Sequence, residues 1–193
     1  MRELQPRVVY LHGFNSSPAS LKAKLVADHC KALRIEAVVP QLSYDPVLAM
    51  NAAQSCIMER ELPALLIGSS LGGYYATWLA EKFGIKAALV NPAVSPCDHL
   101  HADFLGKRRN IYTGEEYEFT REHVKALRQY DVKTIRDPSR YLLLVQTGDE
   151  VLDYRLAVER YAGCRQIVQQ GGNHSFENFA GQLPGIMQFA GLD

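Results

Sequence analysis

Short apolar runs alternate with segments of helical periodicity along most of this chain. The strand-like runs are residues 8–11, 35–39, 64–67, 86–90, 141–146 and 165–169. Between them, apolar residues recur every three or four positions, as Leu21, Leu25 and Val26 do in the first such segment. The predicted helices are residues 17–29, 46–61, 74–83, 154–161 and 176–190. This alternation predicts an α/β protein, a three-layer α/β/α sandwich around a mostly parallel six-stranded sheet.

Capping and breaking residues set the expected helix boundaries. Ser17 is predicted to cap the first helix, with Pro18 as its first residue, and Asp45 to cap the second. Gly84 is expected to end the helix before it. Pro184 lies inside the last predicted helix, so that helix is either broken or begins a second piece there.

The alternation fails between residues 93 and 138. This stretch contains a turn-rich patch at residues 110–115 and a predicted helix at 121–130. An excursion of this length inside an alternating fold is usually functional, and a cap or lid is expected. Its aromatic residues are candidates for an acyl pocket or, alternatively, for packing the excursion onto the body: Tyr112, Tyr117 and Phe119.

Length and charge narrow the function classes. The 193 residues predict a single domain over 1–193, with a substantial core. Twenty-one basic and 21 acidic residues cancel, so neither nucleic acid nor an anionic membrane is indicated as a partner. No apolar run approaches the roughly 20 residues that cross a bilayer, and we expect no membrane span and a cytoplasmic protein. The cysteines form no close pair and are expected to be reduced: Cys30, Cys56, Cys97 and Cys164.

A Gly-x-Ser-x-Gly pentapeptide separates the third predicted strand from its helix. Strand, tight turn and helix are the setting of a nucleophile elbow, with Ser70 at the tip of the turn. Gly68 and Gly72 supply the small residues that such a turn needs. The Leu71 N–H lies at a helix N-terminus, where a developing oxyanion is favoured. The alternative is a Gly/Ser-rich turn with no chemical role.

A nucleophilic serine requires a base and an anion that orients the base. Asp149 follows the fifth strand, and His174 follows the sixth in a glycine-rich loop. The sequence therefore predicts a Ser70–His174–Asp149 triad. Other carboxylates remain alternatives for the acid: Glu150, Asp153 and Asp98.

A second oxyanion donor is expected in the loop after the first strand, where H-G-F begins at His12. A His-Gly pair at this place commonly shapes the loop that donates this N–H, which we assign to Phe14, paired with Leu71. His12 itself is expected to pack the loop. His99 and His101 have a spacing that two metal ligands can share, but no third ligand is evident, and no metal is predicted.

With these residues identified, the chain resembles the α/β-hydrolase superfamily and, more narrowly, the small bacterial YqiA-like esterases. The matching stretches are Y-L-H-G-F-N-S-S-P (10–18), G-S-S-L-G-G-Y-Y-A-T-W-L (68–79), V-N-P-A-V (90–94), Y-T-G-E-E-Y (112–117), Q-T-G-D-E-V-L-D-Y-R (146–155) and G-G-N-H-S-F (171–176). The resemblance implies Ser70 as nucleophile, Asp149 as acid and His174 as base. It also implies hydrolysis of carboxylic esters, with acyl thioesters as a second class.

We therefore expect a serine hydrolase that forms an acyl-enzyme and needs no cofactor. Its expected partner is a small-molecule acyl ester or thioester with a short-to-medium acyl chain. Two kinds of alternative stay open. One is another hydrolase on the same triad, such as an acyl-CoA thioesterase, an amidase or a peptidase. The other is a non-catalytic binding module that keeps the fold.

Overall fold

The larger sheet of the structure has six strands in the order β2-β1-β3-β4-β7-β8, and every neighbouring pair is parallel. The structure is a computed structural model that describes residues 6–99 and 104–193. The strands of this sheet are β1 (Arg7–Leu11), β2 (Glu36–Val38), β3 (Leu65–Ser69), β4 (Lys86–Val90), β7 (Tyr141–Gln146) and β8 (Arg165–Gln169). The sequence prediction of a mostly parallel six-stranded sheet is confirmed.

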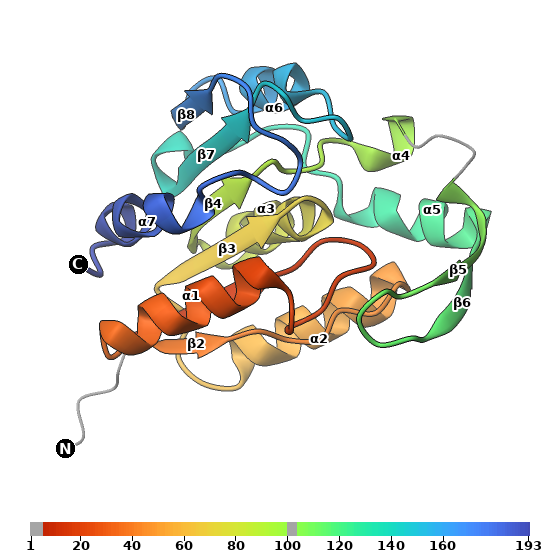
Figure 1. Ribbon diagram of the computed structural model, residues 1–193, viewed down its shortest axis with the longest axis horizontal. Helices are drawn as coiled ribbons and strands as arrows, with labels where there is room; N and C mark the ends of the chain where they lie inside the picture. Colours follow the sequence, from red (N-terminus) through yellow and green to blue (C-terminus); the bar gives the residue numbers. More distant parts are fainter. Residues whose placement is uncertain (1–5, 100–103) are drawn as a thin grey trace.

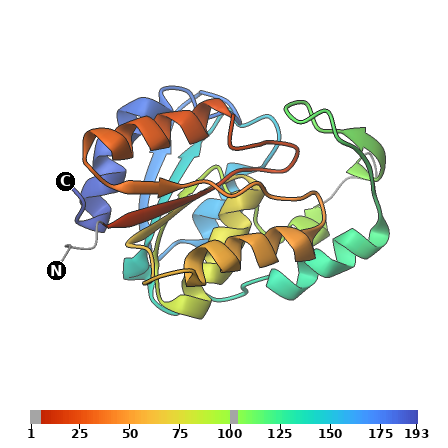
Figure 2. The same cartoon turned by 90° about the horizontal axis from the view of Figure 1, so that it is seen from below.

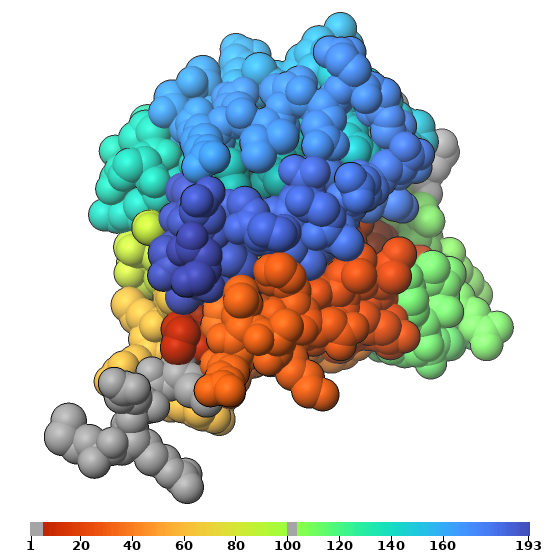
Figure 3. All heavy atoms as spheres, turned by 60° about the vertical axis from the view of Figure 1, so that its left-hand side comes forward, coloured from red at the N-terminus to blue at the C-terminus, as the bar shows by residue number. Residues whose placement is uncertain are grey.

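Helices cover both faces of this sheet and give three layers (Figures 1 and 2). Successive strand residues point to opposite faces, so Val8 and Tyr10 belong to one apolar core and Val9 and Leu11 to the other. One face carries α1 (Leu21–Ala32) and α7 (Leu183–Ala190), which lie side by side in Figure 3. The other face carries α2 (Pro46–Met58), α3 (Leu71–Phe83) and α6 (Tyr154–Arg160).

Most predicted boundaries agree with the structure, but the start of α1 was predicted wrongly. The Ser17 hydroxyl accepts a hydrogen bond from the Ala19 N–H, and the Ser17 carbonyl accepts one from the Ser20 N–H. These bonds close a turn, and the helix begins at Leu21 with Ser20 as its N-cap. The second cap is confirmed, because the Asp45 carboxylate accepts hydrogen bonds from the first turn of α2.

The last predicted helix is divided near Pro184, which confirms the expectation that a second piece begins there. A 3₁₀ turn, η4 (Phe179–Gln182), precedes α7, and Pro184 lies in the first turn of α7, where a proline N–H is not needed.

The excursion is more regular than the sequence indicated. It contains an antiparallel hairpin of β5 (Gly106–Arg109) and β6 (Glu116–Phe119), which sequence reasoning missed. Around the hairpin are α4 (Pro96–His99), α5 (Arg121–Leu127), η2 (Arg128–Tyr130) and η3 (Pro138–Arg140). The hairpin stands at the edge of the molecule reached by the loop after β1, as Figures 2 and 3 show.

The order of the strands reverses between β1 and β3, since β2 lies on one side of β1 and the later strands lie on the other. In open α/β sheets, ligands bind at the carboxyl ends of the strands near such a reversal. The loops after β1, β3, β7 and β8 all emerge at this edge. Within the described residues, no helix has both the length and the apolar character to span a bilayer.

Candidate active site

Ser70 lies at the tip of the turn between β3 and α3, in a backbone conformation that few non-glycine residues adopt. Its φ is 56° and its ψ is −123°. A Cβ on Gly72 would overlap the Leu11 carbonyl oxygen, and a Cβ on Gly68 would lie 2.7 Å from the Gly73 Cα. The two glycines of the pentapeptide are therefore required by close backbone approach, which is the geometry of a nucleophile elbow.

The side chains of His174 and Asp149 complete a hydrogen-bonded row with Ser70. His174 Nε2 lies 3.0 Å from Ser70 Oγ, and His174 Nδ1 lies 2.8 Å from Asp149 Oδ2. Because a carboxylate only accepts, Nδ1 carries the proton and leaves the Nε2 lone pair facing the hydroxyl. The structure thus brings together the three residues that the sequence singled out.

The Asp149 carboxylate is shielded and held in place by the main chain. Its side chain is 1% exposed, and Oδ1 accepts hydrogen bonds from the N–H groups of Val151 (2.9 Å) and Leu152 (2.8 Å). Burial alone would raise the pKa of Asp149, but the hydrogen bonds from His174, Leu152 and Val151 outweigh it and lower that pKa below its ordinary value. The group is therefore an anion at neutral pH.

The three alternative carboxylates have other partners. Glu150 Oε2 accepts a hydrogen bond from the main-chain N–H of His174 at 2.9 Å. Asp153 is the N-cap of α6 and pairs with Arg155. Asp98 pairs with Arg128 and Lys133. Of the four carboxylates, Asp149 is the one bonded to the imidazole ring.

Glycines let the loops of the acid and the histidine lie against each other. A Cβ on Gly148 would overlap the Gly172 carbonyl oxygen, and the Gly148 N–H donates to the Gly171 carbonyl at 2.8 Å. Gly172 has φ of 71°, a conformation that favours glycine. The His174 loop is thus docked directly on the Asp149 loop.

The loop after β1 lies against the serine. A Cβ on Gly13 would be 3.1 Å from Ser70 Cβ and 3.6 Å from Ser70 Oγ. Within residues 6–99 and 104–193, the N–H groups of Phe14 and Leu71 donate no hydrogen bond to the protein. These are the two amides that the sequence assigned to an oxyanion hole, and both flank this contact in the chain.

His12 fixes the orientation of the peptide between Gly13 and Phe14. Its Nδ1 lies 2.9 Å from the Gly13 carbonyl oxygen, and its Nε2 accepts a hydrogen bond from the Leu42 N–H at 3.1 Å. Burial lowers the pKa of His12, so the ring is neutral with its proton on Nδ1. The C=O and N–H groups of a trans peptide point in opposite directions. Because the Gly13 carbonyl faces the His12 ring, the Phe14 N–H of the same peptide points away from it.

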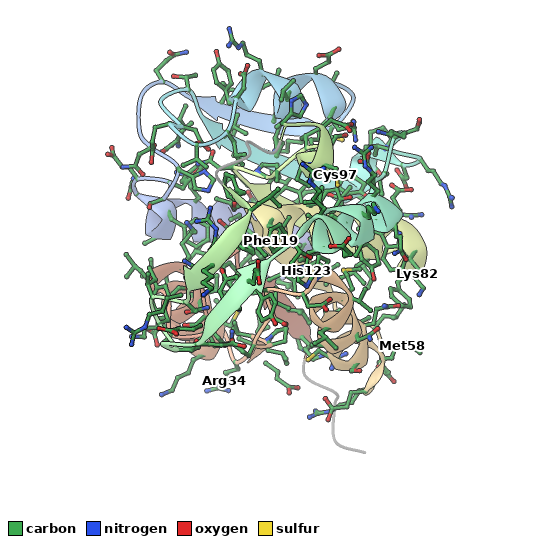
Figure 4. The ribbon with its side chains drawn as sticks, turned by 90° about the vertical axis from the view of Figure 1, so that its right-hand side faces the viewer. Arg34, Met58, Lys82, Cys97, Phe119 and His123 are labelled. Atoms are coloured by element: carbon green, nitrogen blue, oxygen red, sulfur yellow. The ribbon has the colours of Figure 1, made fainter. Side chains whose placement is uncertain are left out.

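Aromatic packing joins the hairpin to the loop after β1. The Phe14 ring lies 5.0 Å from the Phe119 ring and 6.0 Å from the Tyr117 ring, centroid to centroid. Phe119 stacks on His123 of α5 at 5.3 Å, and Figure 4 shows both side chains between the hairpin and α5. Tyr117 stacks on Tyr44 at 4.3 Å.

Of the three aromatic residues proposed for an acyl pocket, two are packing residues in this structure. Tyr117 and Phe119 are 8% and 2% exposed, whereas Tyr112 is 47% exposed near the tip of the hairpin. The alternative from the sequence, that these side chains hold the excursion on the body, therefore describes Tyr117 and Phe119. Only Tyr112 of the three is open to a ligand.

Sequence reasoning missed residues that support the histidine loop. Asn91 and Gln146 donate hydrogen bonds to its backbone, and the Lys22 ammonium donates to the Ser175 carbonyl at 2.8 Å. Burial lowers the pKa of Lys22, and the nearby negative charge of Asp149 opposes that shift. Asn91 lies in the V-N-P-A-V stretch of the resemblance, but its Asn-Pro pair indicates only the end of a strand and not a contact with the histidine loop.

No group of three or more His, Cys, Asp or Glu side chains that could hold a metal ion is found in the part of the chain that the structure describes. His99 lies in α4, and His101 lies outside the described residues.

Many solved structures share this architecture. A putative hydrolase from Agrobacterium vitis S4 has a TM-score of 0.77 at 18% identity, covering 96% of this chain and 88% of that one. Alpha/beta hydrolase domain-containing protein 10 from mouse has a TM-score of 0.76 at 17% identity, covering 100% of this chain and 91% of that one. The esterase domain of a Rhodothermus marinus protein has a TM-score of 0.64 at 22% identity, covering 97% of this chain and 89% of that one. The fold is that of the α/β hydrolases.

Sequence relatives cover almost the whole chain. A UPF0227 protein from Serratia proteamaculans is 27% identical over 198 residues, which span 96% of this chain and 99% of the relative. The family described as an uncharacterised protein family, UPF0227, matches residues 7–191. The protein is therefore a member of the UPF0227 family.

Proposed function

We propose that this protein is a serine hydrolase that cleaves carboxylic esters through an acyl-enzyme intermediate. The observation that carries the proposal is the row Ser70–His174–Asp149, with bonds of 3.0 and 2.8 Å. A serine hydroxyl is a weak nucleophile near neutral pH, and an adjacent base activates it. A neutral imidazole held by a buried carboxylate is such a base.

The first half of the reaction acylates the serine. Ser70 Oγ attacks the ester carbonyl carbon while its proton passes to His174 Nε2. The carbonyl oxygen becomes an oxyanion that accepts hydrogen bonds from the Phe14 and Leu71 N–H groups. The bond between the carbonyl carbon and the alcohol oxygen then breaks, and the alcohol leaves with the proton from His174.

The second half returns the free enzyme. A water molecule gives its proton to His174 and attacks the acyl carbon, and the bond to Ser70 Oγ breaks as Oγ takes the proton back. The carboxylic acid leaves. The His174 side chain is 22% exposed, which supports access for this water.

The substrate class is a carboxylic ester with a short-to-medium acyl chain. The esterase domain with the same fold, named above, supports an ester as the scissile group. Tyr117 and Phe119 are occupied by packing, so the acyl chain is proposed to lie over the exposed edge near Tyr112. Thioesters, including acyl-CoA, are the second class that the same chemistry serves.

The test compares the wild type with Ser70→Ala on p-nitrophenyl butyrate. Loss of the nucleophile should reduce kcat by roughly a million-fold, to background, while the circular dichroism spectrum and Tm stay close to those of the wild type. A fluorophosphonate probe should label the wild type on the peptide that contains Ser70 and leave Ser70→Ala unlabelled. Retained turnover in Ser70→Ala would overturn the proposal.

Matched ester, thioester and anilide probes with the same butyryl group separate the remaining alternatives. An esterase turns over the ester with the highest kcat/KM. Preference for the thioester would reassign the protein to the thioesterases, and efficient anilide cleavage would reassign it to the amidases. A binding module would show neither turnover nor labelling of Ser70.

A further inference from the structure

Two buried amide side chains hold the backbone of the loop that carries His174. Asn91 follows β4 and is 2% exposed, and Gln146 ends β7 and is 3% exposed. Neither residue belongs to the loop that it contacts. We call Asn91 and Gln146 the amide pair.

Asn91 binds the carbonyl side of the loop. Its Nδ2 donates to the carbonyl oxygens of Asn173 (3.0 Å) and His174 (3.2 Å). Its Oδ1 accepts a hydrogen bond from the Gln146 N–H at 3.0 Å. Carbonyls only accept and a peptide N–H only donates, so the chemistry of the partners fixes the orientation of this amide.

Gln146 binds the amide side of the same loop. Its Oε1 accepts hydrogen bonds from the N–H groups of Asn173 (3.1 Å) and Glu177 (2.8 Å), and its Nε2 donates to the Glu177 carbonyl at 2.9 Å. A Cβ on Gly172 would overlap Gln146 Oε1, so a side chain there would displace this amide from the loop. Both backbone polar groups of Asn173, the residue before the histidine, are thus bonded to the amide pair.

Asn91 also connects the histidine loop to the turn that carries Ser70. Val90, which precedes Asn91, accepts the Ser70 N–H at 3.1 Å, and the Asn91 N–H donates to the Leu144 carbonyl at 2.9 Å. Asn91 has φ of 40°, a strained conformation for a residue with a side chain. The backbone at residues 90 and 91 is therefore bonded to the Ser70 turn and to β7, while the Asn91 side chain is bonded to the loop that carries His174.

We propose that Asn91 and Gln146 are positioning residues that set the distance between the His174 imidazole and the Ser70 hydroxyl. The inference rests on the proposed function, because that distance matters only if His174 takes the Ser70 proton. Displacement of a reacting group by about 1 Å can reduce a rate by about 100-fold. The amide pair touches no substrate and acts only through the loop.

Two substitutions at Asn91 separate loss of the whole amide side chain from loss of its N–H donor alone. Asn91→Gly keeps the left-handed backbone accessible and removes every side-chain hydrogen bond. Asn91→Asp keeps the acceptor for the Gln146 N–H and places an oxygen against two carbonyls. Both should lower kcat by about 10- to 100-fold with KM changed by less than about threefold. Rates are expressed per fluorophosphonate-labelled site after labelling has gone to completion, so that neither unfolded molecules nor slow labelling affects the value.

Asn178 offers a matched control. It also has a left-handed backbone, with φ of 56°, but it is exposed and has no bond to the histidine loop. Asn178→Gly and Asn178→Asp should keep kcat per labelled site within about twofold of the wild type.

A second measurement uses only the wild type, so it does not depend on whether a variant folds. The Asn173 amide proton of the wild type should exchange with deuterium as slowly as the amides of β7, because its acceptor is a buried side chain. Fast exchange at Asn173, or unchanged kcat per labelled site in both Asn91 variants, would overturn the inference while leaving a Ser70-dependent esterase intact. If Ser70 is not labelled in the wild type, the proposed function fails and the inference fails with it.

Discussion

The loops of Ser70, Asp149 and His174 and the hairpin of β5 and β6 meet at the same edge of the sheet, but different interactions hold them. The three loops are fixed by close backbone contacts, such as those of Gly72 and Gly148, and by hydrogen bonds from the buried side chains of Asn91 and Gln146. The hairpin is fixed by rings, with Phe119 between Phe14 and His123. Backbone contacts tolerate almost no change, whereas apolar packing tolerates residues of similar volume.

This difference predicts separate consequences for the two regions. Changes in the loops should reduce the rate of the chemical step in a protein that still folds. Changes in the hairpin should reduce stability and leave the rate per folded molecule nearly unaltered.

After removal of the nucleophile itself, the largest effect on the loop side is expected for Asp149→Asn. The amide cannot hold the imidazole in the tautomer that accepts the Ser70 proton, and in other triads the equivalent change lowers kcat by about 10⁴-fold. The measurement is hydrolysis of p-nitrophenyl butyrate per labelled site.

Asp153→Asn is the matched control for this change. Asp153 lies in the same loop, but it caps α6, and asparagine is an equally good N-cap. We expect kcat within about threefold of the wild type. A loss below about tenfold in Asp149→Asn would show that another carboxylate supports the base.

The same difference explains how much could be predicted from sequence. The pentapeptide around Ser70 and the glycines beside Asp149 and His174 reflect short-range steric requirements, which leave a readable pattern in neighbouring residues. The row of Ser70, His174 and Asp149 follows from that pattern, whereas the order of the strands in the sheet was not predicted. Such features are local in sequence even when the resulting contact is long-range.

The hairpin and the amide pair leave no comparable pattern. Lys107, Arg108 and Arg109 give β5 a charged strand without apolar alternation, so its pairing with β6 depends on tertiary packing. Asn91 and Gln146 are polar residues at strand ends, where such residues are common for many reasons. Their role depends on a loop more than 20 residues further along the chain, and only the folded structure places them together.

The largest effect on the hairpin side is expected for Phe119→Ala. The side chain is 2% exposed, and truncation of a buried phenylalanine lowers the free energy of unfolding by about 3–5 kcal/mol. Urea denaturation measures this change, and kcat per labelled site should stay within about threefold of the wild type.

Tyr112→Ala is the corresponding control on the hairpin surface. This side chain is 47% exposed, so the free energy of unfolding should change by less than about 0.5 kcal/mol. A fall in kcat of more than about tenfold in Phe119→Ala would instead place the hairpin within the catalytic arrangement.

A pH dependence of stability should follow from Asp149 and not from the hairpin. The folded state lowers the pKa of Asp149, so its contribution to stability is present above the unfolded pKa of about 3.9 and is lost as the pH falls through the lower folded pKa. The difference in free energy of unfolding between the wild type and Asp149→Asn should therefore shrink with acidification below about pH 4. Denaturation at pH 7, 4 and 3 tests this, and a constant difference would contradict it.

The smallest effect is expected for Tyr117→Phe, which removes one hydroxyl and keeps the ring stacked on Tyr44. The Tyr117 hydroxyl donates to Asn15 Oδ1 at 3.3 Å, a long bond at the boundary between the hairpin and the loop after β1. Burial raises the pKa of Tyr117, so the hydroxyl is a donor throughout the assay range.

Loss of this bond should lower the free energy of unfolding by about 0.5–1.5 kcal/mol, because a typical hydrogen bond contributes that much. The value of kcat/KM should stay within about threefold, since packing of Phe14 against the rings of the hairpin is unchanged. Tyr112→Phe, in the exposed turn, controls for loss of a hydroxyl without loss of this bond. If kcat/KM fell more than about tenfold in Tyr117→Phe alone, the hairpin would position the Phe14 N–H, and the division between a catalytic edge and a packing hairpin would be wrong.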